Sequence, residues 1–208
     1  WLAIFFMERY RLYNEVADLK NMYKIMKSYY AQDGASFYAI GIPMLESVKL
    51  LKSGGMEREA EELLRYYEIH GEMLIKNGLC YPPHEVKYEQ SIVAPAVNYL
   101  FQLYELTGKI LYLEEGKKQL AVLVLFNGHQ PDFHMYENAV RHWDGYWFGK
   151  YKNLGDTFPH YWSSLSGVAF REYEKITGER SYGVKAENSL RGVLSMINSD
   201  GSASCAYV

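Results

Sequence analysis

Residues 141–162 gather the side chains that carbohydrate chemistry uses. Within these 22 residues lie two aspartates, two histidines and three tryptophans: Asp144, Asp156, His142, His160, Trp143, Trp147 and Trp162. A carboxyl group can act as acid, base or nucleophile, and a histidine exchanges protons near neutral pH. An indole ring offers a flat apolar face to a sugar ring. The stretch therefore predicts the floor of a carbohydrate site, and the alternative is a long ordered loop whose aromatic side chains close one end of a helical domain.

The carboxylates of this stretch have different expected roles. Asp144 lies between Trp143 and Gly145, where exclusion of water would raise its pKa toward that of a general acid. A structural hydrogen bond to nearby backbone is the alternative for Asp144. Asp156 lies three residues before Pro159, so its leading role is the N-cap of a helix. A contact with a sugar hydroxyl or a catalytic water is its second role.

A third carboxylate, Glu89, begins a helix that corresponds to the one starting near Pro159 when a 70-residue repeat is subtracted. Glu89 is therefore the candidate second carboxylate of the site, and the alternative is a solvated glutamate that favours the helix dipole. His84, in the preceding link, is a candidate subsite residue together with Glu85 and Gln90.

A second chemistry, β-elimination, needs a base for the C5 proton of a uronic acid and an acid for the leaving oxygen. His160 and Tyr161 are adjacent and suit these roles, and His142 is a further histidine of the stretch. Arg141 is a candidate to pair with a substrate carboxylate, and a surface arginine is the ordinary alternative. Trp143, Trp147 and Trp162 are the candidate sugar platforms.

Other classes of site and partner are not expected. His134 and Glu137 have the spacing of two helical metal ligands, but no third ligand follows, so no metal and no cofactor are assigned. A net charge of −3 provides no basic face for nucleic acid. The apolar start, residues 1–7, is too short to span a membrane. Cys80 and Cys205 are isolated and fit free thiols in a reducing compartment, with a single disulfide between them as the alternative, so we expect a cytoplasmic protein. The oligomeric state stays open.

An internal repeat organises the chain. Residues 105–112 (ELTGKILY) are echoed by residues 175–182 (KITGERSY), and residues 52–56 (KSGGM) form a looser copy. Each copy ends one helix at a glycine and opens the next, as in stacked αα-hairpins. Apolar periodicity predicts seven helices at about 5–29, 37–52, 56–76, 89–106, 110–126, 159–176 and 181–197.

The predicted helices and links are of two kinds. Helices before the glycine turns are richer in small and apolar residues and suit an inner layer, whereas those after the turns are charged and amphipathic and suit an outer layer. Three long links, residues 77–88, residues 127–158 and the chain after Asn198, should emerge at one end of the stack. The sequence thus predicts one all-α domain of αα-hairpins over residues 1–208, part of a longer chain.

This organisation resembles the six-hairpin (α/α) toroids of carbohydrate-active enzymes, which include glycoside hydrolases and polysaccharide lyases. The segment 143–149 (WDGYWFG) is similar to the aromatic-rich turn that carries a catalytic aspartate in unsaturated glucuronyl hydrolases. The resemblance implies a cleft at the long-link end, a uronic-acid-containing oligosaccharide or polysaccharide as substrate, and a catalytic role for Asp144. Because a toroid of this kind has twelve helices, the chain supplies an incomplete one.

Three functions follow in order of preference. The first is a glycoside hydrolase with Asp144 as general acid and Glu89 or Asp156 positioning water. The second is a polysaccharide lyase that uses Tyr161 and a histidine. The third is a glycan-binding domain without catalysis.

Overall fold

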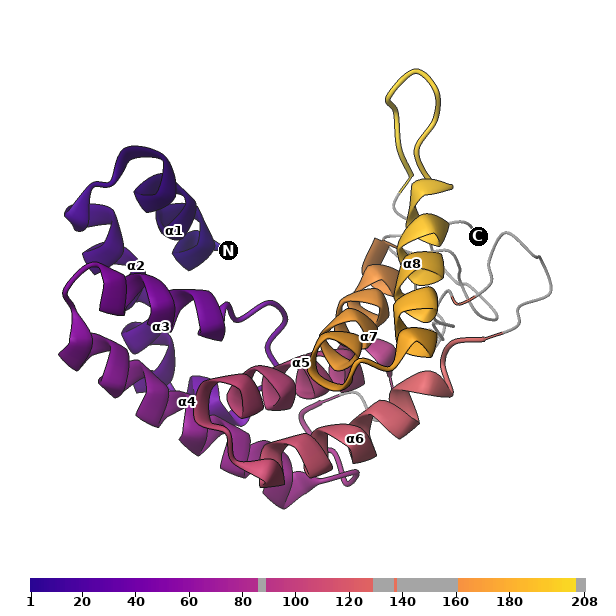
Figure 1. Ribbon diagram of the computed structural model, residues 1–208, viewed down its shortest axis with the longest axis horizontal. Helices are drawn as coiled ribbons and strands as arrows, with labels where there is room; N and C mark the ends of the chain where they lie inside the picture. Colours follow the sequence, from indigo (N-terminus) through magenta and orange to yellow (C-terminus); the bar gives the residue numbers. More distant parts are fainter. Residues whose placement is uncertain (86–88, 129–136, 138–160, 205–208) are drawn as a thin grey trace.

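The computed structural model describes residues 1–85, 89–128, 137 and 161–204, and this part of the chain is helical (Figure 1). The eight described α-helices are α1 (Leu2–Tyr13), α2 (Val16–Ala31), α3 (Met44–Ser53), α4 (Glu57–Asn77), α5 (Gln90–Thr107), α6 (Ile110–Val124), α7 (Ser164–Thr177) and α8 (Arg180–Leu194). Two 3-10 turns, η1 (Gly34–Ser36) and η3 (Tyr161–Ser163), precede α3 and α7. Within the described ranges the β structure is one isolated bridge, between Ile197 and Ala203. The all-α prediction is confirmed.

Consecutive helices pack in pairs, α1 with α2, α3 with α4, α5 with α6 and α7 with α8. Figure 1 shows these hairpins following one another along an arc, with α3, α5 and α7 on the concave side and α4, α6 and α8 on the convex side. Helix α5 contacts both α3 and α7, so the helices that precede the short turns form a continuous inner layer. The hairpins therefore build part of an (α/α) toroid.

The repeat seen in the sequence has the same structure in both of its close copies. Gly108 and Gly178 both adopt the left-handed conformation, with φ of 68° and 75°. Each donates its N–H to the carbonyl four residues earlier at 2.7 Å. Thr107 and Thr177 each accept the N–H two residues ahead at 3.3 Å, while the hydroxyl donates to a carbonyl of the preceding turn. Equivalent sequence has thus produced equivalent helix ends.

The first predicted helix, 5–29, is wrong in one respect, because the structure has two helices here. Asn14 ends α1 in the left-handed conformation with φ of 55°, and its N–H donates to Tyr10 O at 2.8 Å. Asparagine tolerates this conformation better than most residues, so the turn has the geometry of the glycine turns without a glycine. An ion pair between Arg9 and the buried Asp18 closes this hairpin at 3.1 Å.

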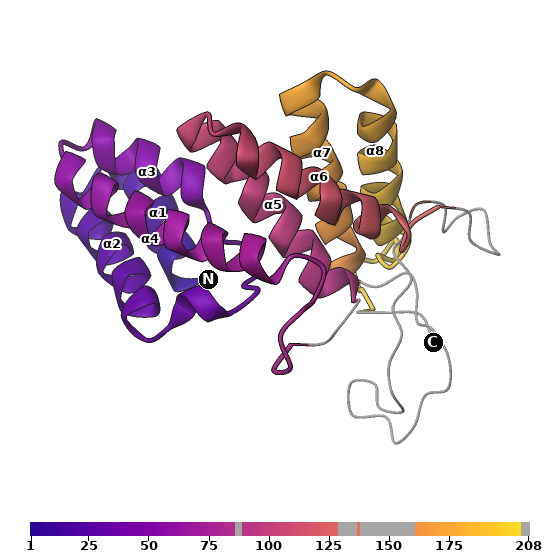
Figure 2. The same ribbon diagram turned by 90° about the horizontal axis from the view of Figure 1, so that it is seen from below.

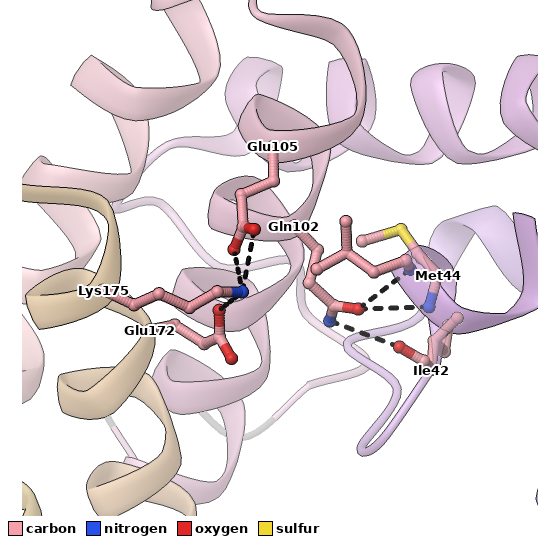
Figure 3. A network of polar contacts seen from close by, with 7 residues as sticks. Ile42, Met44, Gln102, Glu105, Glu172 and Lys175 are labelled. Atoms are coloured by element: carbon pink, nitrogen blue, oxygen red, sulfur yellow. Dashed lines mark hydrogen bonds and ion pairs between the residues drawn. The ribbon is translucent and has the colours of Figure 1, made fainter. Parts of the chain in front are cut away.

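The second predicted helix, 37–52, begins seven residues later than expected, at Met44. Its N-cap residue is Pro43, and no side chain of its own caps it. Gln102 of α5 replaces the missing cap, since its Oε1 accepts the N–H groups of Met44 at 3.1 Å and Leu45 at 3.4 Å (Figure 3). A cap supplied from a distant helix leaves no local pattern, so the sequence placed this boundary too early.

The inner helices are joined by polar contacts as well as by apolar packing. Lys175 of α7 donates to both carboxylate oxygens of Glu105 on α5, at 2.9 and 2.8 Å, and contacts Glu172 at 3.4 Å (Figure 3). Burial and Glu105 raise the pKa of Glu172. Between α5 and α6 the packing is close, because a Cβ at Gly116 would lie 2.5 Å from the Phe101 ring. The Lys175 contacts with Glu105 join two neighbouring hairpins, whereas the close approach at Gly116 sets the spacing of the two helices within one hairpin.

We expect the Gly108→Ala variant to lose about 1 kcal/mol of unfolding free energy, because an L residue with a Cβ pays for the left-handed conformation. Gly108→Asn should lose less, since Asn14 adopts the same conformation in the first hairpin. Urea denaturation followed by circular dichroism measures both. Equal losses for alanine and asparagine would contradict this account of the turn.

Candidate active site at the long-link end

The described parts of the links between hairpins lie at the opposite end of the stack from the short turns. Figure 2 shows the α5–α6 and α7–α8 turns on one side and the α4–α5 link on the other. We use "long-link end" for the end that holds residues 32–43, residues 78–85, Glu89 and the start of η3. The link 32–43 is not among the three long links predicted from the sequence; it is long because α3 begins later than predicted.

Two side chains of the α4–α5 link hold the α2–α3 link against it. His84 Nε2 lies 3.0 Å from Ser36 O, and Glu85 Oε1 accepts the Tyr38 N–H at 3.0 Å. Because a carbonyl oxygen only accepts, His84 donates through Nε2. Its ring also packs edge-on against Phe37, with centroids 5.7 Å apart. In this structure the predicted subsite residue His84 is therefore bonded to backbone, and its role in substrate binding stays a prediction.

A buried histidine of α4 also forms a hydrogen bond to the α2–α3 link. His70 of α4 is fully buried, and its Nε2 lies 2.8 Å from Phe37 O, so Nε2 carries the hydrogen. In the neutral ring Nδ1 can then accept from the Tyr30 hydroxyl at 3.3 Å. Tyr30 OH is 2.9 Å from Tyr99 OH, which reaches Tyr67 O at 3.3 Å. Burial lowers the pKa of His70 to about 4, so the ring is neutral over most of the pH range in which proteins are stable.

The turn that opens the α7 hairpin is clamped from two helices. Gln90, the first residue of α5, is 1% exposed, and its Nε2 donates to Trp162 O at 2.8 Å and to Ser166 Oγ at 3.2 Å. From α8 the buried Ser189 hydroxyl donates to Ser163 O at 3.0 Å. Two consecutive carbonyl groups of η3 are thus fixed by buried side chains, and η3 begins at Tyr161.

Glu89 lies immediately before Gln90, at the N-cap position of α5. Its carbonyl accepts the N–H groups of Ile92 and Val93 at 3.0 Å, and its side chain makes no capping hydrogen bond to α5. The half-buried Glu89 and half-buried Trp162 are thus brought to the same end by the Gln90 contact. The structure joins the two links that the sequence related only through the 70-residue repeat.

The remaining predicted site residues lie outside the described residues. They are Arg141, His142, Trp143, Asp144, Trp147, Asp156 and His160. For Tyr161 the structure describes the backbone position, at the first residue of η3. The helix expected from Pro159 is described from this 3-10 turn onward, with α7 beginning at Ser164. The catalytic and binding roles of all these residues stay predictions.

Glu137 has a different environment from the one its spacing with His134 suggested. It adopts a left-handed conformation with φ of 61°, which is incompatible with an i, i+3 pair on a helix. It is fully buried, and its Oε1 accepts from Lys185 Nζ of α8 at 2.6 Å. Among the described residues no cluster of three or more histidine, cysteine, aspartate or glutamate side chains has the geometry of a metal site. His134 itself lies outside them.

A hollow of about 330 Å³ on the concave side lies among α3, α5 and α7. Pro43, Pro95 and Val168 contribute to its apolar wall. Gln102 and Lys175, also in its lining, are already bonded to backbone and carboxylate groups of the protein. The hollow is therefore the joint between neighbouring inner helices.

In the described part of the chain, no helix is both long and apolar enough to cross a membrane.

The sequence suggested Gln90 as a candidate subsite residue, not as a link between two helices, and it did not identify Ser166, Ser189 or His70 as residues that hold the site. The partners of Gln90 are 72 and 76 residues away, and the partner of Ser189 is 26 residues away. The usable signal was a polar residue at the apolar start of an inner helix. A buried polar side chain needs a partner, but the sequence does not identify which one.

No family model matches the chain, and no curated protein matches it. A solved structure named a polysaccharide lyase is similar to the whole chain, with 47% sequence identity and a TM-score of 0.92. The match covers 100% of this chain and 31% of that chain, so the chain spans about a third of the length of the protein it resembles. At this identity and overlap the two share the helical-hairpin fold.

Proposed function

We propose that this chain is the helical part of a polysaccharide lyase and carries its proton-transfer turn at residues 160–161. The similarity to a named polysaccharide lyase over the whole chain carries this proposal. It supports the lyase hypothesis better than the hydrolase hypothesis that the sequence favoured, in which Asp144 acts as general acid. In the whole protein we propose that further hairpins close the arc into a six-hairpin toroid.

The reaction is β-elimination at a uronic acid. A base takes the C5 proton, the C5–H electron pair forms the C4=C5 double bond, and the C4–O4 bond breaks. An acid then gives O4 its proton, which leaves an unsaturated uronide and a new sugar terminus. Tyr161 suits the acid, because a phenol with an ordinary pKa near 10 holds its proton at neutral pH. His160 suits the base, because a neutral imidazole accepts a proton in that range.

The described geometry supports this assignment through the backbone that carries Tyr161. Proton transfer requires the donor within hydrogen-bond reach of the reacting atom, so the residue must sit on a fixed support. The η3 turn has such a support, because buried side chains from α5 and α8 hold its carbonyls. Glu89, next to Gln90, remains a candidate to contact the substrate.

The test is a panel of neutral and uronic-acid-containing polysaccharides incubated with the full-length protein. A lyase releases products with a new near-ultraviolet absorbance in step with new reducing ends, because each cleavage creates one C4=C5 bond. A hydrolase releases reducing ends without that absorbance, and this result would restore the Asp144 hypothesis. Binding without either product would indicate a glycan-binding domain.

A further inference from the structure

We infer that Gln90 is a positioning residue for elimination, acting through the η3 turn rather than on the substrate. This inference rests on the proposed function and assigns a role that neither the sequence nor the similarity assigns. The buried amide of Gln90 bridges the beginnings of the two inner helices α5 and α7.

The contacts of Gln90 use both hydrogens of its amide. One N–H points to Trp162 O at 2.8 Å and the other to Ser166 Oγ at 3.2 Å. Gln90 is 1% exposed and Ser166 fully buried, so water cannot replace these bonds without opening the packing. The first contact fixes the peptide one residue after Tyr161, and the second fixes the first turn of α7.

The position of this turn is not determined by its own sequence. A 3-10 turn of three residues has few internal hydrogen bonds and weak geometry, and Ser163 caps α7 with no side-chain hydrogen bond. Ser189 holds Ser163 O from the α8 side at 3.0 Å. Gln90 and Ser189 thus hold adjacent carbonyl groups from two different helices. Without Gln90, Trp162 O would lose this buried donor, while Ser163 O would keep its bond from α8.

The consequence for catalysis is geometric. A displacement of about 1 Å of a reacting group can cost about 100-fold in rate. Loss of the Gln90 amide should therefore lower kcat, with little change in KM if the groups that bind the substrate lie elsewhere.

The test compares Gln90→Met with Gln102→Met. Both glutamines lie on α5 and bond to the backbone of a neighbouring element. Gln102 lies toward the C-terminal end of α5 and contacts the backbone of Ile42, Met44 and Leu45 (Figure 3). Methionine keeps the length of the side chain and removes the donors. Gln90→Met should lower kcat by about 100-fold, whereas Gln102→Met should keep wild-type kcat in the folded fraction.

A second variant, Gln90→Glu, separates positioning from a general loss of structure. A carboxylate has no hydrogen to give to Trp162 O, but a protonated carboxyl group has one. Burial raises the pKa of such a group, so the kcat of Gln90→Glu relative to wild type should rise as the pH is lowered. The relative kcat of Gln90→Met should stay low at every pH.

Hydrogen exchange of the peptide covering residues 161–168 gives a readout that needs no substrate. Gln90→Met should speed exchange there, and Gln102→Met should not. If wild type degrades no polysaccharide, the proposed function fails, while exchange still decides whether Gln90 holds the turn. Wild-type kcat in Gln90→Met, or unchanged exchange at 161–168, would overturn the positioning role.

Discussion

The Tyr161→Phe variant of the full-length protein is expected to lose elimination activity by about 10²–10⁴-fold, the usual contribution of a positioned proton donor. Phenylalanine keeps the ring and removes only the O–H that would protonate the leaving oxygen. The loss should fall on kcat, because phenylalanine removes the transferable proton and keeps the shape of the ring. The near-ultraviolet absorbance of the unsaturated product measures the rate.

Tyr104→Phe is the matched control for this change. Tyr104 is a half-buried tyrosine near the short-turn end of α5, where its carbonyl accepts the Gly108 N–H. Loss of its hydroxyl should leave kcat within a factor of about two, as expected for a residue outside the site. A Tyr161→Phe enzyme with wild-type kcat would exclude Tyr161 as the proton donor and would direct attention to His142 and His160.

Acidification from pH 6.5 to about 4 is expected to remove up to about 3 kcal/mol of unfolding free energy through His70 alone. Burial lowers the pKa of His70 from 6.5 to about 4 in the folded protein. Between these two pKa values His70 is protonated in the unfolded chain and neutral in the folded chain, so the free energy of unfolding rises with pH across this window. Well above pH 6.5 both states are neutral and the contribution is constant.

The His70→Gln variant tests this dependence, because an amide can still donate to Phe37 O but does not titrate near neutral pH. Urea denaturation at several pH values should show a shallower loss of stability between pH 6.5 and 4 than in wild type. His84→Gln is the control, since His84 is exposed at its contact with Ser36. Equal slopes for wild type and His70→Gln would contradict the buried neutral histidine.

The sequence determined the helical hairpins well where the signals were local. The glycines at 108 and 178, with the threonines before them, predicted both turns, and the structure gives these turns the same hydrogen bonds. The same rule failed at Asn14, because asparagine is a weaker indicator of the left-handed conformation than glycine. Apolar periodicity then continued through the turn and predicted one helix where there are two.

The start of α3 shows why boundaries depend on the fold. The N–H groups of Met44 and Leu45 are accepted by Gln102, which is nearly 60 residues away. The preceding residues, 36–38, are held by His84, His70 and Glu85 from other parts of the chain. Each of these bonds requires the hairpins to be already packed, so no local pattern in residues 37–43 could have shown where the helix begins.

For the site, the sequence by itself determined the inventory: a cluster of aromatic, histidine and carboxylate residues in the link before α7, and Glu89 at the start of α5. The tertiary structure decided which parts of the chain meet, because Gln90 reaches Trp162 and Ser166 across more than 70 residues. The reactive groups of a residue follow from its type and can be read from the sequence. Which residues lie close together depends on how the hairpins pack. A buried amide with two hydrogens must find two acceptors, and only the packed hairpins decide that those acceptors lie in the turn that carries Tyr161.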